Sequence, residues 1–194
     1  MLGADLVKQL RACESGAAIL EFTLVAWFFF LLVFGTVEFG YYMWQFGAMT
    51  KGGEKGLRYA VVTDPVTSDW TTLLPNSGQV ITCSGGAAAA SATCTLGTVN
   101  QTAMTCIVNK VRAFAPFVQA QNVVIEYQAN DIGLAGAFAP TIKLRLENVT
   151  FTSIFLGFMG GRMLPPLNFT MTAEDLSTAA PGSSSVIDAC GMIS

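Results

Sequence analysis

The feature that most constrains this chain is an apolar run near its N-terminus. Residues 17–47 form a 31-residue stretch that is interrupted by only two charged residues, Glu21 and Glu38. As a helix this stretch would be about 46 Å long, which exceeds the roughly 30 Å hydrocarbon core of a bilayer. Its large apolar residues occur on every side of the expected helix, so the run predicts a helix that faces lipid or other apolar helices rather than water.

The residues before the run predict its orientation. Met1–Gly16 is a short polar leader with two basic and two acidic residues, and the free amino terminus makes it slightly positive. The positive-inside rule therefore predicts a cytoplasmic leader and an exported remainder. A cleaved secretory signal peptide fits less well, because its apolar region spans only about 7–15 residues and precedes an A-x-A-like site.

Glu21 lies where a charge is costly. A carboxylate in a membrane helix costs on the order of 2.5–3.5 kcal/mol by insertion scales, and less near the interface. One interpretation is a boundary carboxylate that snorkels towards the lipid headgroups. The alternative is a specific partner of opposite charge, because a pair compensates in apolar surroundings whereas either charge left unmatched costs several kcal/mol.

The residues around Glu21 resemble the processing site of type IV prepilins. The string is Glu14-Ser-Gly-Ala-Ala-Ile-Leu-Glu21-Phe22. In that family a membrane aspartyl peptidase cuts after a glycine, and the fifth residue of the mature chain is glutamate. The resemblance implies cleavage between Gly16 and Ala17, and pairing of Glu21 with the new ammonium group of a neighbouring subunit. It assigns assembly roles to Glu21, Phe22 and Glu38.

Two further segments resemble TadE/TadF-like minor pilins, or pseudopilins, of the tight-adherence (Flp) pilus system. They are Phe34-Gly-Thr-Val-Glu38-Phe-Gly40 and Gly56-Leu-Arg58-Tyr-Ala-Val-Val62, so the resemblance covers roughly residues 14–62. It implies a long helix that carries a small head. It also implies four partners: inner-membrane lipid, a prepilin peptidase, other pilin subunits and the pilus assembly platform.

One departure from the family lies at Lys51–Lys55, where Gly52 and Gly53 stand in place of alanines. Each interior glycine costs about 1 kcal/mol of helix stability relative to alanine. We therefore expect the helix to bend or fray at this point.

Glu38 follows Glu21 by 17 residues, which is about 25 Å along a helix axis. It is expected near the outer membrane interface, where Tyr41, Tyr42 and Trp44 predict an aromatic belt. One interpretation is that its carboxylate meets lipid headgroups. The other, implied by the resemblance, is that it contacts another subunit.

Five cysteines are an odd number for an exported protein. Loss of the leader, which contains Cys13, leaves Cys83, Cys94, Cys106 and Cys190, an even set that an oxidising periplasm would pair. Three connectivities are possible. We favour Cys83–Cys94, which closes an Ala/Gly/Ser-rich loop, and Cys106–Cys190, which ties the tail to a helix, each contributing roughly 3 kcal/mol.

The exported part predicts an α+β head. Helical spacing of apolar residues over Thr98–Phe114 predicts a helix that packs by one face and stops at a proline. Alternating residues predict strands, and one of them carries charges on a single face, which is typical of an antiparallel sheet with one side wet. The predicted strands are Gln79–Cys83, Asn122–Ala129, Thr141–Phe151 and Leu167–Ala173.

The predicted fold class is thus α+β: a long N-terminal transmembrane helix, then a small antiparallel-sheet head with one packed helix. The domains are a leader (1–16), the apolar helix (17–60) and a periplasmic head with disulfides (61–194). The helix at 98–114 and the end of the first helix are expected to cover the buried face of the sheet.

The connection between the last two strands is unusually apolar. It contains Phe155, Phe158 and Met163. Either it tucks into the core or it presents these three side chains to a partner.

Catalytic and nucleic-acid-binding patterns are absent from the sequence. The net charge of −3 leaves no basic footprint for nucleic acid. The chain has no histidine, no C-x-x-C pair, no P-loop and no G-x-S-x-G, so neither a zinc site nor a familiar nucleophile is expected. We expect no enzyme activity, cofactor, metal or small-molecule substrate.

The expected function is therefore structural. The chain reads as a minor pilin that takes part in assembly of a pilus for surface adhesion. It would sit in the bacterial inner membrane by one pass, with its C-terminal domain in the periplasm, or become part of the extracellular pilus. The alternative is an uncleaved, membrane-anchored periplasmic module for binding or scaffolding.

Overall fold

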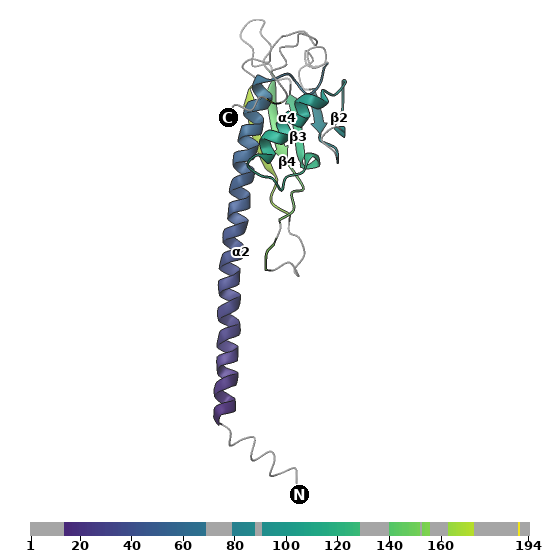
Figure 1. Ribbon diagram of the computed structural model, residues 1–194. Coiled ribbons are helices and arrows are strands. Elements are labelled where there is room, and N and C mark those ends of the chain that lie inside the picture. The colour runs from purple at the N-terminus through teal and green to yellow at the C-terminus, as the bar shows by residue number, and fades with distance from the viewer. Residues whose placement is uncertain are drawn as a thin grey trace. The chain divides into compact units, whose positions relative to one another are not determined.

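The computed structural model of the protein describes residues 14–68, 79–87, 91–128, 140–151, 153–155, 163–172 and 190 (Figure 1). It divides into two compact units. The first contains the N-terminal part of the long helix up to Met43, together with the short stretch that begins at Ser153. The second begins at Trp44 and contains the sheet and a shorter helix. Most of the predicted leader, with Cys13, lies outside the described residues, as does Phe158.

The long helix α2 runs from Glu14 to Val62 and has 49 residues, which confirms the helix predicted over residues 17–60. Its C-terminal part belongs to the second unit, and there Met49, Leu57, Ala60 and Val61 are buried. The helix ends shortly before Pro65, which cannot continue a helical hydrogen-bond ladder.

The second unit contains a five-stranded antiparallel sheet in the order β2-β1-β3-β4-β5. The strands pair in register, so that rows of cross-strand neighbours line each face. One row joins Cys83, Ile125, Leu144 and Phe169, and the first three of these side chains are fully buried. The strands are β1 (Val80–Ser84), β2 (Thr93–Cys94), β3 (Val123–Gln128), β4 (Thr141–Leu146) and β5 (Leu167–Thr172).

The other face of the sheet is polar, as predicted for a sheet with one wet side. Glu126 on β3 lies between two basic side chains of β4, 3.7 Å from Lys143 and 3.1 Å from Arg145. Arg145 also contacts Glu147 at 3.1 Å. Because these ion pairs are partly exposed, they add little to the stability of the fold. Their charged groups favour the orientation in which this face of the sheet lies towards water.

The shorter helix α4 runs from Gln101 to Arg112. It begins at Asn100, whose side-chain oxygen accepts a hydrogen bond from the Ala103 N–H at 3.2 Å, satisfying one of the free donors of the first turn. One face is buried and contains Ala103, Met104, Cys106, Ile107, Val108 and Val111. This confirms the one-sided helix predicted between residues 98 and 114.

Glycines let the end of α2 approach α4 and the sheet closely. A β-carbon at Gly52 would lie 2.8 Å from the Val111 carbonyl oxygen, and one at Gly56 would lie 2.6 Å from Val111 Cγ2. A β-carbon at Gly53 would overlap the ring of Phe169. The expectation that α2 frays at Gly52 and Gly53 is wrong, because the helix continues unbroken to Val62 and both glycines lie against neighbouring groups of the head.

Two details of the sheet differ from the sequence prediction. The two-residue strand β2 was not predicted. The fourth strand ends at Leu146 rather than at Phe151, because Asn148 has a positive φ of 55°. The Asn122 side chain donates to the carbonyl oxygens of Glu147 and Asn148 at 2.8 and 2.9 Å, which holds the chain in this turn.

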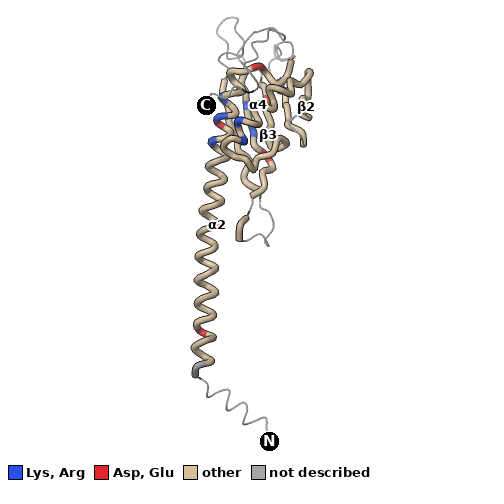
Figure 2. The backbone as a smooth tube through the Cα atoms, viewed as in Figure 1, with Lys and Arg blue, Asp and Glu red and all other residues tan. Residues whose placement is uncertain are grey.

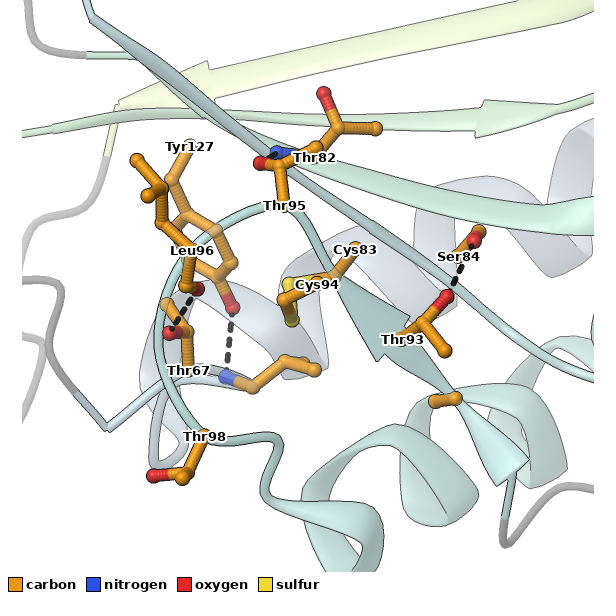
Figure 3. Close-up of a disulfide and its surroundings, with 12 residues drawn as sticks. Thr67, Thr82, Cys83, Ser84, Thr93, Cys94, Thr95, Leu96, Thr98 and Tyr127 are labelled. Carbon is orange, nitrogen blue, oxygen red and sulfur yellow. Dashed lines mark hydrogen bonds between the residues drawn. A yellow bond between two sulfur atoms is a disulfide. The ribbon is translucent and has the colours of Figure 1, made fainter.

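Both favoured disulfides are present in the structure, Cys83–Cys94 and Cys106–Cys190. Cys83 and Cys94 are direct cross-strand partners, so this disulfide fastens the short strand β2 to β1. Figure 3 shows it together with a buried hydrogen bond, in which the hydroxyl of Tyr127 accepts from the Val66 N–H at 2.9 Å. Burial of the hydroxyl raises the pKa of Tyr127 to about 12.

The close packing of Gly52 against α4 predicts that a glycine-to-alanine substitution in α2 changes stability differently at two positions. Gly52→Ala puts a methyl group against a backbone oxygen of α4 and should lower the free energy of unfolding by about 1–2 kcal/mol, despite the gain in helix propensity. Gly47→Ala meets nothing within 4 Å and should be neutral or stabilising by up to about 1 kcal/mol. Denaturant unfolding of the full chain in detergent measures both, and equal effects would contradict this packing.

Tyr127 predicts a loss of stability in alkali. Its pKa of about 12 in the folded state exceeds the value near 10 expected when unfolded, so the folded state holds the proton more tightly. The stability that this contributes is complete below about pH 10 and is lost as the pH rises through 12, by about 2–3 kcal/mol. Unfolding measured from pH 8 to 11 should show the start of this loss, and Tyr127→Phe should flatten it while costing about 1–2 kcal/mol at neutral pH. An unchanged slope in the variant would refute the assignment.

Candidate functional site

The N-terminal part of α2 exposes an almost continuous apolar surface. Phe22 is 74% exposed and Trp27 is 72% exposed, and large apolar side chains between them and beyond are similarly uncovered. Figure 2 shows that acidic and basic residues gather around the sheet and the end of α2, whereas most of the remaining helix is uncharged. By length and composition, this helix could cross a membrane.

Hydroxyl groups within this apolar surface are satisfied by the helix itself. The Thr23 hydroxyl donates to the Ile19 carbonyl oxygen at 2.7 Å, and the Thr36 hydroxyl donates to the Val33 carbonyl oxygen at 2.8 Å. A hydroxyl bonded in this way needs no water. The surface is therefore suited to lipid or to other apolar helices.

The predicted cleavage residues lie in the first turns of α2. Gly16 and Ala17 are both exposed, and Gly16 has no other group crowded against it. A glycine in the first turn lowers helix stability by about 1 kcal/mol relative to alanine, which makes local opening of this turn easier. Access of a peptidase to this bond is thus sterically open among the described residues.

Glu21 stands alone within the apolar surface. Its side chain is exposed. No hydrogen bond or ion pair connects it to another residue that the structure describes. It lies one helical turn after Ala17, with Phe22 beside it. A carboxylate in this position is solvated only if water or an external cation reaches it, and both are scarce in hydrocarbon.

Glu38 is in a different situation, because it is 6% exposed. Its carboxylate accepts hydrogen bonds from two backbone N–H groups of the connection between β4 and β5. The N–H of Ile154 lies 3.2 and 3.3 Å from the two carboxylate oxygens, and the N–H of Phe155 lies 3.1 Å from Oε2. Two roles were considered for Glu38, contact with lipid headgroups and contact with another subunit. These hydrogen bonds test neither of them.

Two of the three residues of the predicted partner patch are described. The ring of Phe155 stacks on Phe34 of α2, with ring centroids 4.9 Å apart, and it stays 45% exposed. Met163 is 67% exposed and belongs to the second unit, where it forms an isolated bridge with Thr150. Phe158 lies outside the described residues, so the grouping of the three side chains as one patch stays a prediction.

Sequence reasoning missed the contact between Glu38 and the connection at residues 154 and 155. It singled out both segments, but separately. The partners are backbone N–H groups 116 and 117 residues further along the chain, and a backbone donor leaves no trace in residue identity. The sequence offered one signal. Glu38 had no evident partner for its charge, and the apolar connection that contains residues 154 and 155 had no evident packing site.

Among the residues that the structure describes, no group of three or more histidine, cysteine, aspartate or glutamate side chains could hold a metal ion. The candidate site consists of the exposed apolar surface of α2 and the carboxylates of Glu21 and Glu38. An arrangement of this kind is suited to association with lipid or with other apolar helices. Its selectivity among helices would come from the positions at which each carboxylate needs a group of opposite charge.

Comparison with known proteins agrees with this arrangement. No curated protein and no solved structure matches the chain. Residues 16–58 match the family model described as TadE-like protein. The matched segment contains Gly16, Glu21, Glu38 and the glycines that pack against α4. Over this N-terminal segment the chain is therefore similar to TadE-like proteins.

Proposed function

We propose that this chain is a minor pilin, or pseudopilin, that takes part in assembly of a tight-adherence (Flp) pilus for surface adhesion. A prepilin peptidase removes the leader after Gly16. The mature protein is held in the bacterial inner membrane by α2, with the sheet-containing head in the periplasm, and passes into the pilus with other subunits. Its role is structural rather than catalytic.

The observation that carries this proposal is the isolated carboxylate of Glu21 on an exposed apolar helix. A helix that served only as an anchor would gain nothing from a charge there, because the charge makes insertion less favourable. Cleavage before Ala17 creates an ammonium group that can match Glu21 on another copy. The resulting pair fixes the register between neighbouring helices, since any other register leaves two charges unmatched in apolar surroundings.

The apolar surface of α2 supports the same proposal. In the membrane, lipid tails cover Phe22, Trp27 and their neighbours. In a pilus, the same side chains pack against helices of other subunits. Exchange of lipid for helix gains little hydrophobic free energy, so association depends on close packing and on polar contacts such as the Glu21 pair.

Processing can be tested by the mass and N-terminal sequence of the protein recovered from membranes. We expect a mature chain that begins Ala17-Ala18-Ile19, and full-length precursor in cells that lack the prepilin peptidase. Recovery of a chain that retains Met1 in cells with an active peptidase would favour the uncleaved, anchored module instead.

The role of Glu21 can be tested separately from cleavage. Glu21→Ala should be processed and should accumulate in the membrane, because it makes the helix more apolar. Its amount in sheared pili should fall about tenfold or more, since a lost pairing of several kcal/mol is larger than the 1.4 kcal/mol that corresponds to tenfold. Glu21→Gln should fail in the same way, because it keeps the shape and removes the charge.

Glu54→Ala is the matched control for Glu21. Glu54 is also an exposed glutamate of α2, but it lies beyond the apolar run. This variant should enter pili at the normal level. If Glu21→Ala and Glu54→Ala were recovered in pili equally well, the argument from charge pairing would be refuted.

A further inference from the structure

We propose that the backbone turn at Ile154–Phe155 inserts into the outer leaflet of the membrane beside α2, held there by Glu38. This inference rests on the proposed membrane-spanning role of α2. It assigns a lipid-contacting surface to a segment of the chain far from the helix in sequence. It also gives Glu38 a function within its own chain.

The depth of the turn follows from its contact with α2. Phe155 stacks on Phe34 at 4.9 Å, and Phe34 stacks in turn on Phe30 at 6.0 Å. Phe34 precedes the aromatic residue Tyr41 by seven positions, which is about 10 Å along the helix. If Tyr41 and its neighbours lie at the outer interface, the ring of Phe155 lies within the hydrocarbon, whose half-thickness is about 15 Å.

The side chains of the turn suit that position. Ile154 is 56% exposed and Phe155 is 45% exposed, although each could have packed into a core. The exposed surface of Phe155 adjoins that of Phe34, because the two partly exposed rings stack on each other. In water this combined apolar surface would be unfavourable and would favour aggregation, whereas contact with lipid acyl chains removes it from water.

The hydrogen bonds to Glu38 remove the main objection to a turn at this depth. Backbone N–H groups in hydrocarbon are costly unless they are bonded, which normally excludes irregular segments from the bilayer. The N–H groups of Ile154 and Phe155 both donate to the Glu38 carboxylate. The same bonds satisfy the carboxylate, so two groups that would each be unfavourable in lipid compensate each other.

Lipid is a better occupant than a second copy of this chain. The contact with Phe34, Glu38 and Phe155 forms within one molecule and needs no neighbour. The surface left exposed continues the part of α2 that is expected to face lipid before assembly. A contact with another copy is therefore an alternative outcome of the test rather than part of the proposal.

The test uses the full chain in phosphatidylcholine vesicles, with a single tryptophan. Trp27, Trp44 and Trp70 are replaced by phenylalanine, and Phe155→Trp supplies the probe. We expect quenching by lipids brominated in the upper part of the acyl chain, weaker quenching by lipids brominated near the chain end, and protection from acrylamide in the water. A variant that retains only Trp27 reports insertion of α2 independently.

Lipid quenching of Trp27 together with free access of acrylamide to the probe at position 155 would overturn this inference and leave the pilin proposal intact. Failure to quench either tryptophan would refute membrane insertion of both segments. Protection of the probe that appears only at a high ratio of protein to lipid would also overturn the inference, in favour of a contact between copies.

Glu38→Gln tests the anchor. It keeps the shape of the side chain and removes its charge, so the ratio of docked to undocked turn should fall about tenfold, seen as greater access of acrylamide to the probe at position 155. Glu54→Gln, on the exposed face of α2 beyond the apolar run, is the matched control and should leave that access unchanged. Equal access in the two variants would refute the role assigned to Glu38.

Discussion

The constraint on which this structure depends is that a carboxylate in apolar surroundings must have a partner. α2 carries two such carboxylates on its apolar stretch, and they are treated differently. Glu38 is buried and accepts hydrogen bonds from two backbone N–H groups of the same chain. Glu21 is exposed and none of the described residues pairs with it. One charge is matched within the molecule, and the other is available to be matched by a neighbour, which is the asymmetry that the proposed assembly requires.

The same helix also changes its environment along its length. Its N-terminal part exposes large side chains and belongs to one compact unit, whereas its C-terminal part belongs to the unit that contains the sheet. The change is made by small residues. Gly52 and Gly56 let α2 approach α4 to within contact of Val111, so the last turns form part of the core of the head.

Much of the fold could be predicted because it follows simple periods. The long apolar run predicts α2, and alternating residues predict β3, β4 and β5. The errors have physical causes. A two-residue strand such as β2 has no period to detect, and its place depends on the Cys83–Cys94 disulfide. Glycines were expected to weaken α2 because propensity considers a helix alone, whereas Gly53 lies against the ring of Phe169. At the candidate site, Glu21 was recognised from its local string, but the partners of Glu38 are backbone groups and could not be.

The two glutamates of the TadE-like segment are therefore not equivalent, although both are acidic residues in one apolar helix. A subunit contact through Glu38 would have to compete with donors that already occupy both of its carboxylate oxygens. Breaking that contact would leave the N–H groups of Ile154 and Phe155 without an acceptor next to the exposed ring of Phe34, at a cost that a neighbouring subunit would have to repay. Glu21 carries no such cost, because no described group must be displaced before it pairs. In the proposed assembly, pairing through Glu21 that leaves Glu38 bonded to the chain's own turn is the arrangement with the fewest unmatched charges and backbone donors.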